Sequence, residues 1–320
     1  MGLGCKKAHL SFCVAALLAC ATPALAATDA PEPQATAACE LKPGPTRSVV
    51  RVIDAETVQL DDGRQVRLIG ALAPHSPDLG NDADLWMPDE NAVTALRALV
   101  LGRTVELGYG GRKQDRYGRQ LAHLFLNRDG RRVWVQGELL SNGFARAYGL
   151  PGSYACIREL LAHEQVARDA HAGLWTNGAY AIRNAKRSRV LLRERNTYQI
   201  VVGTVARVKV TRARTYLDFG KDWRKDFSVG VDTKILRANP EWAETLASLE
   251  GRRVEVRGWI DYSFGPFIRI EDPSQIAVIE ESLPGPTLPP GGATTSSERR
   301  RTPLEKQKRP EPKLPGAFNL

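Results

Sequence analysis

The sequence predicts a mainly β protein with some helices, built as two small Greek-key barrels. Short runs with alternating apolar residues recur between turn signals such as Asp62-Gly63 and Asp129-Gly130. Helical spacing is confined to a few segments, and these end at glycines. In the second half, three strands, a helix and two strands follow one another. That order predicts a five-stranded barrel of the OB type.

The chain has 320 residues, which is enough for two domains. Residues 1–26 are typical of a secretory signal peptide, because Lys6 and Lys7 precede an apolar run that ends near Ala24-Leu25-Ala26. Cleavage after Ala26 predicts an exported protein, periplasmic or secreted. The alternative is a lipoprotein anchored at Cys20. No later stretch is long and apolar enough to predict a transmembrane segment.

Removal of the signal leaves two cysteines, Cys39 and Cys156. Two cysteines in an exported chain are expected to form a disulfide. It would tie the N-terminal arm to a helix near residue 156. Loss of the two lysines in the signal lowers the net charge from +9 to +7. This basic surplus fits a polyanionic partner, and it equally fits a role in solubility.

Residues 27–46 are rich in Ala, Pro and Thr and predict a flexible arm. A first domain is predicted over residues 47–176, opening with strands around Val50, Val52, Val58 and Leu60 and a hairpin turn at Asp62-Gly63. Its later elements are a helix at 90–101, strands at 104–107, 121–126 and 133–135, and helices at 136–142 and 153–172. Each helix is followed by a glycine, a common C-terminal signal.

Residues 177–196 are strongly basic and predict a linker or a solvated helix, with a nucleic-acid patch as the alternative. A second, OB-like domain is predicted over residues 197–280. Its strands fall at 200–210, 216–219, 227–231, 253–259 and 267–270, with a helix at 241–249. Four aromatic residues are expected mostly to pack this barrel, the alternative being stacking on nucleobases; they are Trp223, Trp259, Phe264 and Phe267. No motif identifies a protein partner. Residues 281–320 form a proline-rich basic tail predicted to be disordered.

Two arginines of the first domain stand at strands. Arg67 lies between Val66 and Leu68, and Arg119 follows a polar turn and opens an apolar run. A guanidinium held by a strand suits phosphate recognition, because its fork meets two phosphate oxygens at once. Two such groups can also stabilise the extra negative charge of a pentacoordinate transition state.

With both stretches in view, the chain resembles the staphylococcal nuclease-like (thermonuclease) family over roughly residues 47–176. The family segments V-x-D-G-D-T-V, V-R-L-x-x-x-D-x-P-E and D-x-Y-G-R-x-L-A correspond here to residues 52–58, 66–75 and 115–122. The resemblance implies an OB-type barrel with three helices. It also implies hydrolysis of phosphodiesters by a calcium ion, two arginines and a glutamate that activates water.

Residue by residue, the resemblance places the phosphate arginines at Arg67 and Arg119 and the substrate-contacting tyrosine at Tyr117. The first calcium carboxylate falls on Glu56, flanked by Asp54. The second falls on Leu72, which has no side-chain oxygen. Because Ca²⁺ takes six to eight oxygen ligands, we expect its binding to be weakened severely.

The general base of the family falls on His75. A neutral imidazole can accept a proton near pH 7, so base catalysis by His75 is chemically feasible. The opposing interpretation is a surface loop histidine, since no residue nearby stands at a spacing that would orient it. Carboxylates of the same stretch, Glu90 among them, are alternative bases.

The sequence therefore predicts an exported thermonuclease-like protein that binds nucleic acid, or another phosphodiester or polyanion, through an arginine clamp. Calcium-dependent hydrolysis is expected to be weak or lost. The first alternative is an active nuclease with an altered metal site or His75 as base. The second is a structural or interaction module of the cell envelope.

Overall fold

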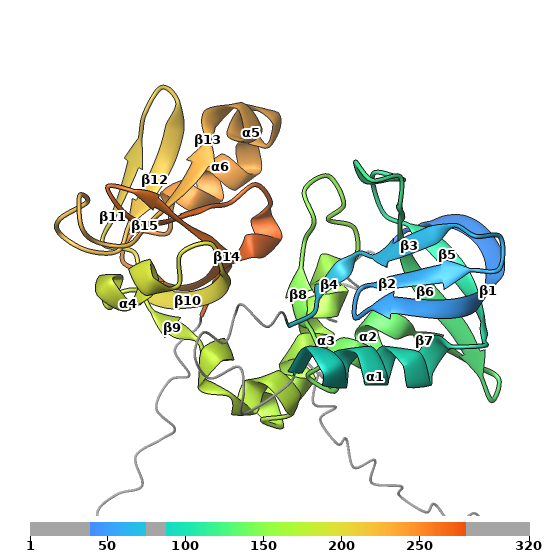
Figure 1. Cartoon of the computed structure of the whole chain (residues 1–320). Helices are drawn as coiled ribbons and strands as arrows, with labels where there is room; N and C mark the ends of the chain where they lie inside the picture. The colour runs from blue at the N-terminus through green and yellow to red at the C-terminus, as the bar shows by residue number, and fades with distance from the viewer. Residues whose placement is uncertain (1–38, 75–87, 280–320) are drawn as a thin grey trace, which may run out of the picture.

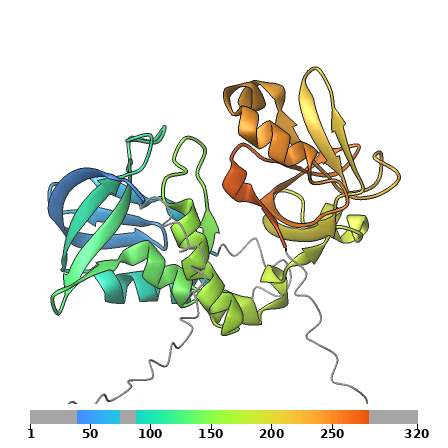
Figure 2. The same ribbon diagram turned by 180° about the vertical axis from the view of Figure 1, so that it is seen from behind.

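A computed structural model describes residues 39–74 and 88–279 (Figure 1). The predicted signal peptide, most of the N-terminal arm, His75 and the proline-rich tail lie outside these residues. Figure 1 shows two groups of strands, one coloured blue to green and one yellow to orange. Figure 2, from behind, shows the chain passing from the first group to the second through a helical segment.

The first group is a closed five-stranded barrel. Its strands are β1 (Lys42–Asp54), β2 (Thr57–Leu60), β3 (Gln65–Leu68), β5 (Thr104–Tyr109) and β6 (Gln120–Arg128). They pair in the order β3-β2-β1-β5-β6, and β3 closes the circle by pairing with β6 in parallel. β7 (Arg131–Trp134) extends from β6 as a hairpin. The predicted OB-type barrel is confirmed.

The predicted hairpin turn joins β2 to β3, and Gly63 adopts the positive φ of 83° that such a turn requires. The strand predicted around Val50 and Val52 is present as β1, but these two residues do not share a buried face. Val49 and Val52 are buried, whereas Val50 is 53 % exposed. The register of β1 against β2 shifts between Val49 and Arg51, and a bulge of this kind breaks the alternation of side chains.

Three helices accompany the first barrel: α1 (Pro88–Val100), α2 (Val135–Ser141) and α3 (Ile157–Asp169). The first two lie close to their predicted ranges. The third begins at Ile157 rather than at Ser153, because Cys156 has the left-handed φ of 64° and cannot continue a helix. A small sheet that the sequence did not predict pairs β4 (Gly70–Leu72) with β8 (Arg146–Tyr148).

The second group contains β10 (Tyr198–Thr204), β11 (Arg207–Val210), β12 (Arg214–Asp218), β13 (Ser228–Asp232), β14 (Arg253–Ser263) and β15 (Gly265–Arg269). The sequence predicts β10 and β11 as one strand. The strand is interrupted between them because the two backbone N–H groups there point to different strands. That of Val205 donates to the carbonyl of Arg252 beside β14, and that of Ala206 donates to the carbonyl of Asp218 on β12. If β10 and β11 are counted as one bent strand, the strands of the second group follow the same order as those of the first barrel. The parallel pair among these strands is β13 with β15.

Two short helices, α5 (Thr233–Ala238) and α6 (Pro240–Ala247), lie between β13 and β14, where the sequence predicts one helix. The remaining elements are η2 (Gly173–Thr176), η3 (Gly178–Tyr180), β9 (Arg183–Asn184), α4 (Ser188–Arg193), η4 (Pro273–Gln275) and β16 (Ile276–Val278).

The basic segment 177–196 is more structured than a linker or a solvated helix. β9 pairs with β10 in the second sheet. Ala185 and Leu191 are buried in the core of the second barrel, at 2 % and 0 % exposure. Arg183 is ion-paired with Glu194 at 2.9 Å between Nη2 and Oε1. Its apolar residues therefore anchor the segment while most of its arginines face outward.

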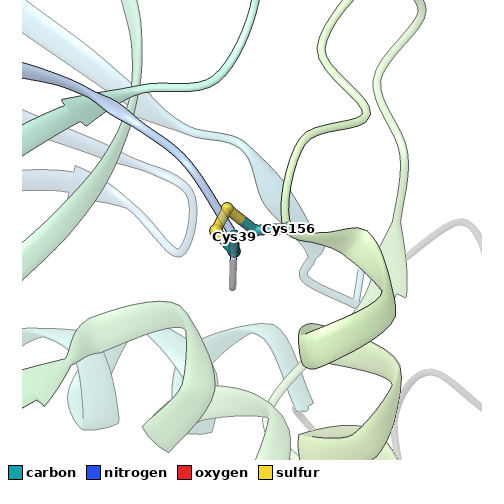
Figure 3. Close-up of a disulfide and its surroundings, with 2 residues drawn as sticks. All are labelled: Cys39 and Cys156. Atoms are coloured by element: carbon teal, nitrogen blue, oxygen red, sulfur yellow. A yellow bond between two sulfur atoms is a disulfide. The ribbon is translucent and has the colours of Figure 1, made fainter. Parts of the chain in front are cut away.

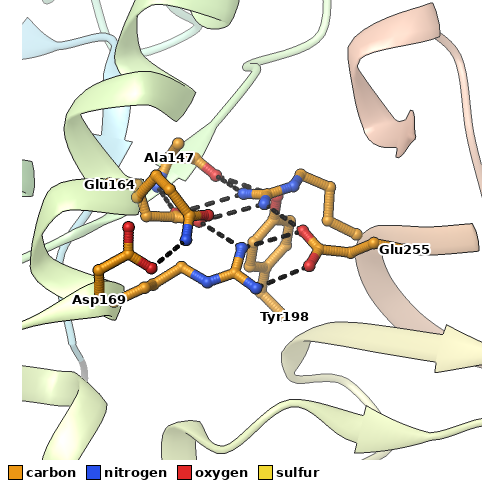
Figure 4. A network of polar contacts seen from close by, with 8 residues as sticks. Ala147, Glu164, Asp169, Tyr198 and Glu255 are labelled. Carbon is orange, nitrogen blue, oxygen red and sulfur yellow. Dashed lines mark hydrogen bonds and ion pairs between the residues drawn. The ribbon is translucent and has the colours of Figure 1, made fainter. Parts of the chain in front are cut away.

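A buried polar network connects the two barrels (Figure 4). Arg257 on β14 contacts Glu164 on α3, with 3.1 Å between Nη2 and Oε1. The same Nη2 lies 2.7 Å from Oε1 of Glu255, whose carboxylate also contacts Arg168 of α3. Tyr198 on β10 donates its hydroxyl to the carbonyl of Ala147 at 3.1 Å. The two barrels are therefore joined by charged groups that are largely withdrawn from water.

The predicted disulfide between Cys39 and Cys156 is confirmed (Figure 3). The two Cα atoms are 4.9 Å apart, and the bond closes a separation of 117 residues. A loop of that length corresponds to a stabilisation of roughly 3–5 kcal/mol. Within the part of the chain that the structure describes, no helix is long and apolar enough to cross a membrane.

His123 on β6 has no exposed surface. Its ring meets the Trp134 ring edge to face, with 5.3 Å between the centroids. Burial disfavours the charged imidazolium and lowers the pKa of His123 to about 4. The residue is therefore neutral in the folded protein at pH 7.

Candidate functional site

An open cavity of ≈ 740 Å³ lies at the rim of the first barrel. It is bounded by the turn between β1 and β2, by one face of α1, and by side chains from β3 and the turn before β6. The lining residues are Ile53, Asp54, Ala55, Glu56, Thr57, Arg67, Pro74, Asp89, Glu90, Val93, Thr94, Arg97 and Arg119. The cavity thus brings together five of the residues singled out from the sequence, namely Asp54, Glu56, Arg67, Glu90 and Arg119.

Arg67 is held at the cavity by Glu56. Thr57 and Arg67 are partners across β2 and β3, which places the arginine beside the β1–β2 turn. Nη2 of Arg67 donates to Oε2 of Glu56 at 3.0 Å. The other oxygen, Oε1, accepts the backbone N–H of Ala73 at 2.9 Å. Glu56 is only 7 % exposed, so its carboxylate acts as the buried counter-charge that orients Arg67.

The turn itself is closed by Asp54, whose Oδ1 accepts the backbone N–H of Glu56 at 2.7 Å. This is an Asx-type bond, in which a short carboxylate side chain substitutes for a backbone acceptor. Asp54 is exposed. It therefore shapes the backbone that presents Glu56 and leaves its second oxygen at the cavity edge.

Arg119 is oriented in the same way, by Asp115. Nε of Arg119 donates to Oδ2 of Asp115 at 2.7 Å, and Nη1 lies 3.3 Å from the hydroxyl of Thr57. Oδ1 of Asp115 accepts the backbone N–H groups of Tyr117 and Arg119. Burial acts to raise the pKa of Asp115, but these hydrogen bonds outweigh it and the pKa is lowered. A fixed negative charge thus pins Arg119 at neutral pH.

Both arginines keep donors for a ligand. A guanidinium carries five N–H groups. Arg67 gives one hydrogen bond and Arg119 two to the side chains just described. Their side chains remain 25 % and 22 % exposed. The arrangement is a pair of oriented cations facing one cavity, which suits an anion with several oxygens.

Tyr117 stands on the turn before β6, outside the residues that line the cavity. It is 67 % exposed. The guanidinium carbons of Arg116 and Arg119 lie 4.7 and 5.5 Å from the centroid of its ring. The ring is therefore placed next to one of the two arginines, at the edge of the site.

The sequence reasoning missed Arg97 and Asp89, and named Glu90 only as an alternative base. All three lie on the wall that α1 contributes. Glu90 and Arg97 are seven residues apart in the sequence, and residues spaced by two helical turns share one face. That spacing, next to a helix start rich in acids, is the signal that would have found them.

The two positions that the resemblance assigns to calcium carboxylates, Glu56 and Leu72, offer no unengaged carboxylate oxygen. Leu72 is 4 % exposed, lies on β4 and does not line the cavity. Both oxygens of Glu56 are already engaged by Arg67 and Ala73. Over residues 39–74 and 88–279, no three or more His, Cys, Asp or Glu side chains gather as metal ligands. Ca²⁺ takes six to eight oxygens, so this set is insufficient by itself.

His75 lies outside the described residues. Its assignment as a general base stays a prediction.

The fold and the cavity define a class of protein. A closed OB-type barrel is a fold that binds oligonucleotides and oligosaccharides, and two oriented arginines at its rim suit an anionic ligand. The family model of staphylococcal nuclease homologues matches residues 65–177.

The chain is also similar to several known proteins. An uncharacterized endonuclease of Escherichia coli O157:H7 is 30 % identical over 129 residues, which cover 40 % of this chain and 76 % of that protein. A thermonuclease of Staphylococcus hyicus is 27 % identical over 135 residues, covering 41 % and 76 %. An uncharacterized protein of Methanocaldococcus jannaschii is 26 % identical over 146 residues, covering 40 % and 70 %. The chain belongs to the staphylococcal nuclease-like family.

Proposed function

We propose that this protein binds nucleic acid, or another phosphodiester polyanion, by clamping phosphates between Arg67 and Arg119, and that its calcium-dependent hydrolysis is weak or lost. The observation that carries the proposal is the shared cavity. Both guanidinium groups face it, and each is oriented by its own carboxylate, Glu56 or Asp115. Membership of a nuclease family supports the same class of ligand.

The clamp is strong because its donors are oriented before a ligand arrives. A charged hydrogen bond to a phosphate contributes about 1.5–3 kcal/mol, provided that the donor need not be ordered on binding. The ion pairs of Arg67 and Arg119 have already fixed their planes. Tyr117, beside Arg119, is available to contact the sugar or base next to the bound phosphate.

We expect weak hydrolysis because of the residues at the positions where the family has calcium-binding carboxylates. Where the family uses carboxylates to hold an ion, this chain offers Glu56, which is committed to Arg67, and Leu72, which has no oxygen. Without that ion, the arginines still bind and neutralise a phosphate, but they do not activate water. Groups that act as a unit lose most of their effect when any one of them is missing, so the loss of either part is expected to remove most of the hydrolysis.

A second candidate is an active nuclease with a rearranged site. Asp54, Asp89 and Glu90 line the same cavity as the two arginines, so further carboxylates are at hand as bases or ligands. His75 remains an additional candidate base.

We further propose that the protein is exported, by cleavage after Ala26 or by lipid attachment at Cys20. The Cys39–Cys156 disulfide supports an extracellular or periplasmic location, because such bonds persist in oxidising compartments.

The test uses the mature protein with labelled single-stranded DNA and RNA over a range of salt concentrations. Arg67→Ala and Arg119→Ala should each weaken binding about tenfold or more and flatten its salt dependence. The control is Arg103→Ala, since Arg103 is exposed and lies outside the cavity. Unchanged affinity in both cavity variants overturns the clamp.

Hydrolysis is tested with calcium, with other divalent ions and with a chelator. We expect little or no cleavage, and some gain on the double replacement Leu72→Asp and His75→Glu. Metal-stimulated cleavage that disappears in Arg67→Ala and Arg119→Ala would instead establish the active nuclease.

A further inference from the structure

Two aromatic side chains of the second barrel are exposed to solvent and lie next to each other. Trp223 lies in the loop between β12 and β13, and Phe264 lies in the turn between β14 and β15. They are 38 % and 61 % exposed. Their ring centroids are 5.2 Å apart, with 72° between the planes. Phe264 adopts a φ of 67°, a left-handed conformation that is unfavourable for a bulky residue.

The other two aromatic residues considered for this barrel behave as expected of packing residues. Phe267 is 2 % exposed. Trp259 is edge to face with Tyr148 and Tyr198 at the junction of the barrels. Packing therefore accounts for Phe267 and for one side of Trp259, which is 43 % exposed at the junction. It does not account for the exposure of Trp223 and Phe264.

A cavity of ≈ 200 Å³ opens beside the exposed pair. Aromatic and polar side chains share its lining, among them Tyr216, Trp223 and Phe264 with Lys209, Ser228 and Ser263. The volume is below the roughly 300–1,000 Å³ of pockets that enclose a small molecule. It fits one flat ring of a longer ligand, with hydroxyl groups available to its edge.

The charges around the cavity favour an anionic ligand. The single acid of the lining is Asp218, and Nε of Arg207 contacts its Oδ2 at 3.1 Å. Two cations, Arg207 and Lys209, line the cavity against this one acid. Arg224 also lies over the Trp223 ring, 4.6 Å from its centroid. Aromatic rings among surplus cations are the composition of sites for single-stranded nucleic acid.

The location of this cavity in the second barrel favours the same kind of ligand as its lining residues do. Phe264 lies in the turn before β15, and Arg119 lies in the turn before β6. Among the barrel strands named above, these two make the parallel pairings, with β13 and β3 respectively. The cavity of the second barrel thus opens at the same loop as the arginine cavity of the first. OB barrels bind oligonucleotides at this loop and the adjoining strands.

We propose that the second barrel binds unpaired bases of single-stranded nucleic acid by stacking them on Trp223 and Phe264. Lys209 and Arg224 neutralise the neighbouring phosphates. This site is distinct from the arginine clamp in both residues and chemistry, because it recognises the π-face of a base rather than a phosphate.

The test uses the full mature chain and two labelled probes of equal length, oligodeoxythymidylate and an abasic oligomer with the same phosphates. Trp223→Ala and Phe264→Ala should each weaken binding of the thymidylate about tenfold and leave binding of the abasic oligomer within about twofold. Trp223→Phe keeps a ring and should retain most of the affinity, which separates loss of stacking from loss of fold.

The matched control is Tyr262→Ala, since Tyr262 is an exposed aromatic residue on β14 that does not line the cavity. Unchanged thymidylate binding in both cavity variants overturns the proposal, and so does an equal loss for both probes. Binding of an acidic peptide that is lost in the same variants, with thymidylate unaffected, assigns the surface to protein instead. Arg67→Ala should affect both probes alike, so failure of the clamp and failure of this site give different results.

Discussion

Arg257 provides the most direct test of how the two barrels are joined. It is 5 % exposed and lies between two carboxylates, of which Glu164 belongs to the first domain and has no exposed surface. Arg257→Met keeps the aliphatic volume and removes the charge. Removing one partner of a buried ion pair costs about 3–5 kcal/mol, because the other charge stays buried without its partner.

The remaining contacts determine where in that range the loss falls. Glu255 keeps Arg168, at 2.7 Å between Oε2 and Nη2. Glu164 keeps the backbone N–H of Ala147 at 2.6 Å, but its distance to Arg168 is 3.6 Å. One carboxylate therefore stays well paired and the other only partly. We expect a loss near the lower end, about 3 kcal/mol.

The measurement is urea unfolding of the full chain, with the free energy extrapolated to water. Arg253→Met serves as control, since Arg253 lies on the same strand and is exposed. Glu164→Gln and the double variant complete a cycle, in which the double variant should be less damaged than the two single losses together. A loss below about 1 kcal/mol in Arg257→Met, or strict additivity in the cycle, refutes the reasoning.

Three further predictions concern the first barrel. Burial lowers the pKa of His123 to about 4, whereas its pKa in the unfolded chain is about 6.5, so its contribution to the free energy of unfolding is complete above pH 6.5 and is lost as the pH falls towards 4. Between pH 7 and pH 5 the free energy of unfolding should therefore fall by about 2 kcal/mol. His123→Gln should remove most of that difference. Reduction of the Cys39–Cys156 bond should lower stability by roughly 3–5 kcal/mol, and two thiols reactive in the untreated native protein would contradict the bond. Asp115→Asn should weaken single-stranded DNA binding severalfold by loosening Arg119, and an unchanged affinity would show that this ion pair does not orient the arginine.

The barrels were predictable because their signals are local. Turns with glycine at positive φ, such as Gly63 and Gly130, separate short alternating runs, and each signal is complete within a few residues. Val50 was misplaced because a bulge depends on the partner strand, which the sequence of one strand does not reveal. The segment 177–196 looked solvated because arginines dominate it. Its anchors, Ala185 and Leu191, are too few to form a periodic pattern.

The residues of the candidate site likewise include some that a local sequence signal predicts and others that it does not. Arg67 and Arg119 were found because each sits at a strand within a short motif. Asp115 opens the motif at residues 115–122 but received no role of its own, because its ion pair with Arg119 is visible only in three dimensions. The pair Glu164 and Arg257 is separated by 93 positions, and a single sequence carries no sign of such contacts.

The disulfide makes residues 39–156 a closed covalent ring. All five strands of the first barrel, together with Arg67 and Arg119, lie along that ring. A protease that cuts one peptide bond inside it opens the ring but releases no fragment, so the nicked molecule keeps every strand attached. The second barrel lies outside the ring. One cut between residues 170 and 197 would sever the covalent link to it, leaving noncovalent contacts to hold the two halves together, among them the charged junction around Glu164 and Arg257 and the contact of Trp259 with Tyr148.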